Sequence, residues 1–236
     1  MMRIITQVCF LFFLPLIVVG QVSNTELRTT LLVKDLERES RPFRSASNGP
    51  EVDGDPYFTP SWCGGTITLY RENKTYQVHA LKYDVLNYGI DLLFENDVLK
   101  SLDGGLVQSF EYKDSLTNLP HRFVNGKDFT RDGVPVHGFL EVLCWGKVDV
   151  YSYVEATLLR PNYNMALATG NKNYQISKKK IMLYSPGTEL RPLNKKELTK
   201  IWSERAQEMD KFQRINKLSL SRERDLMLMI DYFNTL

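Results

Sequence analysis

The apolar residues of this 236-residue chain change their period near Pro192. Between residues 65 and 185 they form short runs rich in β-branched and aromatic side chains, separated by Gly, Asn and Asp turns. Such runs are typical of antiparallel strands. After Pro192 they recur every three or four positions, as in an amphipathic helix. The change predicts an α+β fold, in which an antiparallel β-rich body, a sandwich or a half-open barrel, precedes a C-terminal helical hairpin.

Two β-hairpins are predicted within the body, because paired strand-like runs flank short polar turns. Their strands are expected at residues 65–70 and 75–83, and at residues 138–145 and 148–159. Shorter strands are expected at residues 106–112, 174–177 and 181–185. The last two flank Lys178, Lys179 and Lys180, so we interpret these lysines as a charged hairpin tip rather than a contact with anionic lipid.

The predicted helical hairpin begins at Asn194, a good N-cap that is followed by Glu197 three residues later. Its first helix carries an apolar stripe formed by Leu198, Ile201, Trp202, Met209, Phe212 and Ile215. A second helix is expected from near Ser221. Two amphipathic helices must bury their apolar faces, so we expect this hairpin to pack against the sheet or against another chain.

The first twenty residues have the pattern of a secretory signal peptide. Arg3 supplies the positive charge, the apolar run extends from Val8 to Val19, and Val18 and Gly20 fit the small-residue sites before a cleavage point. The mature protein is therefore expected to begin at Gln21 and to be periplasmic or extracellular. No later stretch approaches the roughly 18 apolar residues of a membrane-spanning helix, so no transmembrane segment is expected after cleavage.

Export narrows the classes of function. It separates the protein from ATP, nicotinamide cofactors and chromatin, so we expect no cofactor and no nucleic-acid partner. The charge agrees with this expectation, because 30 Lys and Arg against 28 Asp and Glu give a net charge of +2. So small a net charge creates no general attraction for nucleic acid.

Residues 21–54 are polar and show no clear period, so we interpret them as a tether. Their charged run at residues 34–39 could form a short helix on a partner, and we favour a solvated linker. The remaining chain divides into a β-rich domain at residues 55–190 and the helical hairpin at residues 191–236, packed on that domain.

Cys144 and His137 are the first candidates for a nucleophile and its base. They stand seven residues apart in one predicted strand. Because side chains of a strand alternate between its faces, an odd separation places the two on opposite faces unless a bulge intervenes. We therefore favour a packed cysteine, and the catalytic residues stay unknown.

Two further sets of polar residues could carry chemistry. His121, Asp128, Asp132 and His137 could supply metal ligands, but their spacing matches no metal template, so no metal site is expected. Glu141, Asp149 and Glu155 could supply paired carboxylates for glycoside cleavage. Exposed strand charges explain these three equally well.

Cys63 and Cys144 are the only cysteines that remain after cleavage. An oxidising compartment permits them to form a disulfide, which would tie the first predicted hairpin to the second. The equal alternative is a pair of buried free thiols, because the sequence does not show whether the two Cα atoms approach within about 7 Å.

Several short aromatic motifs carry a resemblance to a known group of proteins. These motifs are Asp55-Pro56-Tyr57-Phe58 with Trp62, Leu81-Lys82-Tyr83-Asp84 with Asn87, Phe139-Leu140-Glu141-Val142-Leu143 followed by Gly146-Lys147, and Asp231-Tyr232-Phe233-Asn234. With them, most of residues 55–236 resembles small exported Bacteroidetes proteins of unknown function. The resemblance implies an envelope location and a β-rich body with C-terminal helices. It transfers no catalytic residue, because none is established for that group.

Together these features favour an exported, non-catalytic binding or structural module of the cell envelope, whose partner is an envelope protein or a glycan. The alternative is an envelope hydrolase that acts on glycan or peptide. An enzyme needs converging polar groups in a concave pocket, whereas a binding module needs an apolar or aromatic surface. The positions of His121, Asp132, His137 and Glu141 therefore distinguish the two.

Overall fold

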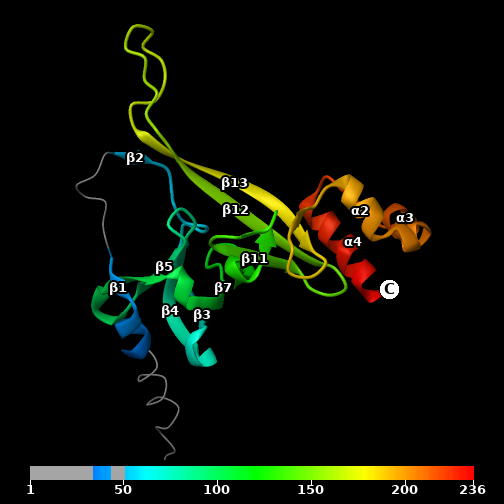
Figure 1. The fold of residues 1–236 in the computed structure, drawn as a ribbon, viewed down its shortest axis with the longest axis horizontal. Coiled ribbons are helices and arrows are strands. Elements are labelled where there is room, and N and C mark those ends of the chain that lie inside the picture. Colours follow the sequence, from blue (N-terminus) through cyan, green and yellow to red (C-terminus); the bar gives the residue numbers. More distant parts are fainter. Residues whose placement is uncertain (1–33, 44–50) are drawn as a thin grey trace, which may run out of the picture.

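The computed structural model describes residues 34–43 and 51–236 (Figure 1). The predicted signal peptide and its cleavage site lie outside the described residues. Among those described, no helix combines the length and apolar character needed to cross a membrane.

One large sheet and a group of C-terminal helices make up the molecule, which confirms the predicted α+β class. The strands follow the order β1-β6-β5-β4-β3-β7-β8-β11-β12-β13-β14, and every neighbouring pair on this path is antiparallel. Their bounds are β1 (Arg41–Pro42), β3 (Cys63–Leu69), β4 (Thr75–Asp84), β5 (Gly89–Leu93), β6 (Leu99–Asp103), β7 (Val107–Lys113), β8 (Pro120–Asn125), β11 (Phe139–Cys144), β12 (Asp149–Leu159), β13 (Tyr174–Ser185) and β14 (Arg191–Pro192).

Three short strands lie off this path. β2 (Val52–Asp53) runs parallel to the start of β13. β9 (Thr130–Arg131) and β10 (Val134–Pro135) form a separate two-stranded sheet. The helices after β14 are α2 (Lys195–Ile201), α3 (Ala206–Ile215) and α4 (Glu223–Thr235).

Both predicted hairpins are confirmed. β3 and β4 pair from Thr68↔Thr75 to Cys63↔Leu81, around a 3-10 turn at Arg71–Asn73. β11 and β12 pair next to the turn at Gly146, with a bulge between Val142 and Cys144. Each hairpin is predicted by the alternation of apolar and polar side chains along its two strands. The same alternation fixes how each strand pairs with its neighbour.

The prediction for Lys178, Lys179 and Lys180 is wrong. The two short strands expected on either side are one continuous strand, β13, and the three lysines pair with residues 154–156 of β12 near its middle. The Lys178 ammonium donates to the carbonyl of Tyr57 at 2.8 Å. The turn between β12 and β13 lies instead at residues 160–173.

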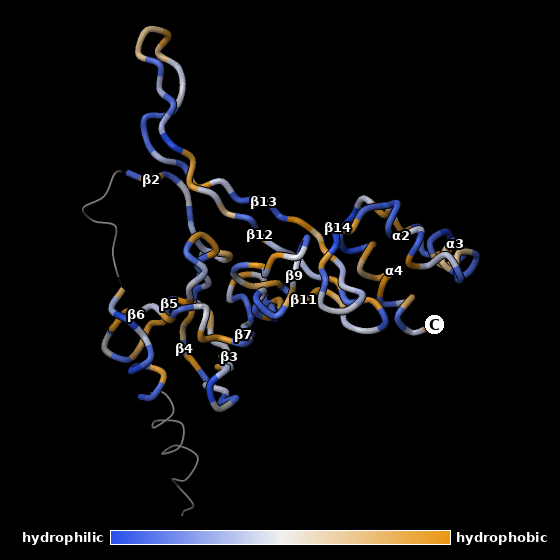
Figure 2. Tube along the Cα trace, in the orientation of Figure 1, coloured by the Kyte–Doolittle hydropathy of each residue, from blue (hydrophilic) through white to orange (hydrophobic). Residues whose placement is uncertain are grey.

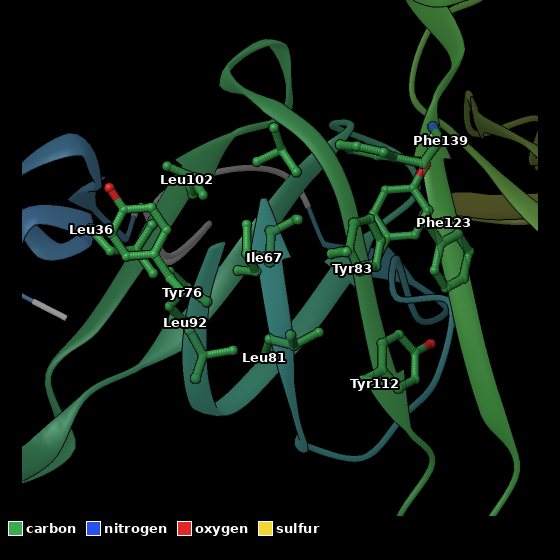
Figure 3. Packing of buried hydrophobic residues seen from close by; sticks show 14 of the residues in the cluster. Leu36, Ile67, Tyr76, Leu81, Tyr83, Leu92, Leu102, Tyr112, Phe123 and Phe139 are labelled. Atoms are coloured by element: carbon green, nitrogen blue, oxygen red, sulfur yellow. Dashed lines mark hydrogen bonds between the residues drawn. The ribbon is translucent and has the colours of Figure 1, made fainter. Parts of the chain in front are cut away.

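The solvated-linker interpretation of residues 34–39 is also wrong. These residues form a helix, and Leu36 is fully buried in the main core. Lys100 of β6 holds the helix from outside, because its ammonium lies 3.0 Å from the Glu37 carboxylate. One apolar residue among charged neighbours is enough to anchor this segment, since the sheet supplies the cavity that receives it (Figure 3).

Within the main core, β4, β7, β8 and β11 bring a group of aromatic rings together (Figure 3). Tyr83 lies among Phe110, Phe123 and Phe139, with ring centroids 5.3 to 5.6 Å from its own. The buried Tyr83 hydroxyl accepts a hydrogen bond from the backbone N–H of Phe139 at 3.1 Å. This contact joins the first half of the sheet to the second.

The C-terminal helices cover the end of the sheet at β11, β12 and β13 (Figure 1). Asn194 caps α2, accepting the Glu197 N–H at 3.1 Å, as predicted. The first predicted helix is broken after Trp202 by a 3-10 turn, and Trp202 lies in the second apolar cluster with Met209. The predicted apolar stripe is therefore buried or half-buried within this chain, except at Ile215, which is 67% exposed.

Candidate binding groove

The sheet opens between β8 and β11. The two strands pair only at Phe139↔Asn125, Leu140↔Val124 and Glu141↔Phe123. Beyond these three pairs, β8 continues against β7 alone and β11 continues against β12 alone. The diverging strands leave a hollow of about 620 Å³ between them.

A second hollow of about 310 Å³ continues the first across the outer face of β3, β7 and β8. The two hollows share Thr66, Glu111, Arg122, Val142 and Trp145 in their linings. We call the combined surface the sheet groove. It lies on the face opposite the aromatic core, because Thr66 and Glu111 alternate with the buried Ile67 and Phe110.

Short side chains keep the floor of the sheet groove open. Thr66 and Thr68 of β3 lie beside their register partners on β7, Glu111 and Ser109, along this floor. Gly65 is required where β3 approaches β7, because a Cβ atom there would lie 2.1 Å from the Glu111 carbonyl oxygen. Larger residues on these strands would fill the groove.

The walls of the sheet groove are aromatic on one side and charged on the other. Trp145, in the turn after β11, is 68% exposed. Arg122 and Glu111 stand opposite each other in β8 and β7, with Nε 3.3 Å from Oε2. Both charged side chains are largely exposed, so they remain available to a ligand.

His121 and Glu141 form a polar pair beside the groove. Nδ1 of His121 lies 2.6 Å from Oε1 of Glu141. His121 is among the residues that line the larger hollow, whereas Glu141 is buried. The carboxylate therefore orients the ring. The rings of Phe58 and Tyr112, with centroids 5.6 and 5.3 Å from that of His121, hold the imidazole in place.

A buried hydroxyl lies beside this pair. Ser152 of β12 stands opposite Glu141 in the strand register, and its Oγ is buried without a hydrogen-bond partner among the described residues. Such a group is costly to bury. It adds a second polar atom near the Glu141 carboxylate.

His137 and Cys144 do not meet. His137 precedes β11 and its ring stacks on Tyr88, with centroids 6.2 Å apart, whereas Cys144 ends the strand. Burial, reinforced by a hydrogen bond with Asp231, raises the pKa of the Cys144 thiol to about 12. The thiol is therefore protonated at neutral pH and packs in the core, as predicted, rather than acting as a nucleophile.

Cys63 and Cys144 are free, buried thiols in the structure, which is the second of the two alternatives considered for them. They lie in different apolar clusters, on strands that β7 and β8 separate. Sγ of Cys63 lies 3.5 Å from the Ser61 carbonyl, and Sγ of Cys144 lies 3.4 Å from the Met227 sulfur. No disulfide joins the two hairpins here.

The other predicted site residues are dispersed. Tyr70 donates to the carboxylate of Asp128, Asp132 lies in the β9–β10 turn, Arg131 pairs with Glu155, and Asp149 accepts the Gly146 N–H. Of the candidate polar residues, only His121 and Glu141 are brought into contact. Within residues 34–43 and 51–236, no three His, Cys, Asp or Glu side chains form a group that could hold a metal ion.

Sequence reasoning missed the sheet groove itself. Its lining comes from five strands, β3, β4, β7, β8 and β11, and only the strand register brings Thr66, Glu111, Arg122 and Trp145 together. The alternation along β3 and β7 does show which residues face outward, so it could have indicated the polar face. Comparison of the chain with protein-family models, curated proteins and solved structures finds no match.

Proposed function

We propose that this protein is an exported, non-catalytic binding module of the cell envelope and that its sheet groove binds a glycan. The observation that carries the proposal is the exposed Trp145 ring at the edge of an open, polar groove. A sugar has an apolar C–H face that can pack on an indole ring, and hydroxyl groups that need polar partners. Arg122, Glu111 and Gln77 supply such partners along the lining.

The shape of the groove supports a chain-like ligand. Two connected hollows follow the surface of the sheet, and their combined lining mixes small, charged and aromatic side chains. A compact cofactor would be enclosed by a deeper apolar pocket. An oligosaccharide, in contrast, can lie along the threonines of the floor with one ring against Trp145.

The experiment is calorimetric titration of the protein with soluble oligosaccharides of glucose, mannose and N-acetylglucosamine. Replacing Trp145 with Ala should weaken binding about tenfold or more, because aromatic anchors dominate such surfaces. Arg122→Ala should have a smaller effect, since its guanidinium is exposed. Ile215→Ala, an exposed position on α3, is the matched control. Absence of binding to every sugar, or equal binding by Trp145→Ala, would contradict the proposal.

A second function, hydrolysis of an envelope glycan or peptide, is favoured by the contact between His121 and Glu141. A carboxylate that orients an imidazole can make it a general base, and His121 is among the residues that line the groove. The same titrations distinguish the two functions. A hydrolase would release product, and His121→Asn would abolish release while keeping most of the binding, whereas a binding module leaves every bound sugar intact.

A further inference from the structure

β12 and β13 form a long ribbon that extends away from the rest of the molecule (Figure 1). Its strands pair from Asp149↔Ser185 near the helices to Leu159↔Gln175, and residues 160–173 close the far end. Hydrophobic residues lie at the tip of that end (Figure 2). The most exposed of them are Leu159, Met165 and Leu167, at 49%, 86% and 69%.

The turn at the tip of the ribbon is ordered by its own hydrogen bonds. The N–H of Asn164 donates to the Thr169 carbonyl at 2.8 Å, and the reverse bond measures 3.3 Å. The Asn164 side chain accepts the N–H groups of Ala166 and Leu167 at 3.0 and 3.2 Å. The turn therefore holds Met165 and Leu167 outward, and it satisfies several backbone groups internally, which an apolar environment requires.

The part of the ribbon from residue 156 to residue 180 carries only positive charges. Residues 156–180 contain Arg160, Lys172, Lys178, Lys179 and Lys180 and neither Asp nor Glu, although the whole chain is almost balanced at 30 basic against 28 acidic residues. Two acidic residues from outside lie beside it, because Asp53 of β2 accepts a hydrogen bond from Asn173 and the Glu51 carbonyl accepts the Tyr174 N–H. The ribbon is thus a local concentration of basic residues behind an apolar end.

Not all of these cations are available to a partner. Lys178 donates to the Tyr57 carbonyl, Lys180 pairs with Glu223 at 2.7 Å, and Lys179 stands opposite Glu155 in the register. Arg160 and Lys172 lie nearest the tip, and Lys172 sits over the Tyr163 ring, 4.8 Å from its centroid. A tyrosine and a lysine just behind an apolar tip are the arrangement typical of a membrane interface.

We propose that the ribbon tip docks this protein on a bilayer that contains anionic phospholipid. Met165 and Leu167 enter the boundary between headgroups and acyl chains, and Arg160 and Lys172 contact the phosphates. Charge complementarity selects this partner, because an apolar end with a basic collar suits anionic lipid better than a neutral protein surface. The proposal is independent of ligand binding in the sheet groove.

The test is sedimentation with vesicles of phosphatidylcholine alone and of phosphatidylcholine with about one-third phosphatidylglycerol. The double variant Met165→Ser, Leu167→Ser should lower partition onto the anionic vesicles about tenfold or more. The double variant Arg160→Gln, Lys172→Gln should lose the preference for anionic vesicles. All variants keep the same N-terminus, so any contribution of residues 1–20 to binding is common to them.

Ile215→Ser is the matched control, because Ile215 is 67% exposed on α3 and should leave partition unchanged. Both double variants should keep the melting temperature of the parent, since the tip side chains they change lie on the exposed turn. Failure of the parent protein to bind anionic vesicles, or equal binding by the serine variant, would overturn the proposal. So would a crosslinker at position 165 that captures a protein while vesicle binding is absent.

Discussion

At the scale of single residues, the motif from Leu81 to Asp84 has a structural explanation. The Tyr83 hydroxyl accepts the Phe139 N–H inside the aromatic core. The Asp84 carboxylate accepts the N–H groups of Leu86 and Asn87, each at 2.9 Å, and the Asn87 side-chain amide at 2.7 Å. These residues close the turn between β4 and β5 and attach it to β11.

Asn234 has a comparable role at the other end of the chain. Its side-chain amide accepts the Val148 N–H at 2.9 Å and donates to the Val148 carbonyl at 3.2 Å. A Cβ atom on Gly146 would lie 2.7 Å from the same amide. Two of the short motifs, Gly146-Lys147 and the one that ends at Asn234, therefore meet where α4 docks on the β11–β12 turn.

We predict that Asn234→Ala lowers the free energy of unfolding by about 1 to 3 kcal/mol, because two half-buried backbone groups lose their partner. Urea denaturation provides the measurement. Asn234→Asp keeps the acceptor for the Val148 N–H and should show a smaller loss. A change of less than about 0.5 kcal/mol in the alanine variant would mean that water replaces the amide without penalty.

At the scale of elements, α2 and α3 depend on one buried ring. Trp202 is 7% exposed and lies with Leu198 and Met209 in the cluster that joins the helices to β11, β12 and β13. Its backbone also ends α2, because its N–H bonds to the Leu198 carbonyl and its carbonyl accepts the Arg205 N–H. The ring packs at the point where the helix changes direction.

Trp202→Ala should therefore destabilise the protein by about 3 to 5 kcal/mol, the usual loss for a large buried aromatic residue. Thermal and urea unfolding would show it as a lower midpoint. Ile215→Ala, on the exposed side of α3, should change stability by less than about 0.5 kcal/mol. If the two variants behaved alike, the helices would contribute little to the stability of the sheet.

At the scale of the whole molecule, buried tyrosines link stability to alkaline pH. Burial raises the pKa of Tyr83, Tyr112 and Tyr153 above the ordinary value of 10.0, and raises that of Tyr151 to about 12. The folded protein then holds these protons at a pH where the unfolded chain releases them. Stability should be unaffected by these groups below about pH 10 and should fall as pH rises above it.

Urea denaturation from about pH 8 to pH 11 tests this dependence. Tyr83→Phe removes one ionisable group from the core and should make the alkaline fall shallower, although its stability at neutral pH also drops through the lost Phe139 contact. A stability that stayed constant or increased above about pH 10 would show that the hydroxyls ionise within the fold.

The elements that could be predicted from the sequence are those whose residue patterns lie within a short stretch of chain. The hairpin of β3 and β4, that of β11 and β12, and the Asn194 cap each depend on residues within a short stretch of chain. Leu36 could not be predicted as a core residue, because strands far along the sequence form its cavity. The continuity of β13 through three lysines likewise depends on β12, which supplies a paired partner for every one of them.

The candidate site was still less accessible to sequence reasoning. His121 and Glu141 were both singled out, but for different chemistry, and only the short pairing of β8 with β11 brings them together. From the sequence, Trp145 was expected only as the last residue of a strand at residues 138–145. Its exposure follows from the turn that α4 secures through Asn234.

The three-pair junction of β8 with β11 also has a mechanical consequence. Only the short strands β1, β2 and β14 pair over fewer positions, with two pairs each, whereas β12 and β13 are joined along eleven pairs. A force that anchored the ribbon tip and pulled on the strands before β8 would load this short row of hydrogen bonds, together with the two pairs of β2 with β13, the His121–Glu141 contact and the packing of Phe139. β8 would separate from β11 first, while β12, β13 and the C-terminal helices stayed folded. A molecule held at both ends would therefore lengthen before it unfolded completely.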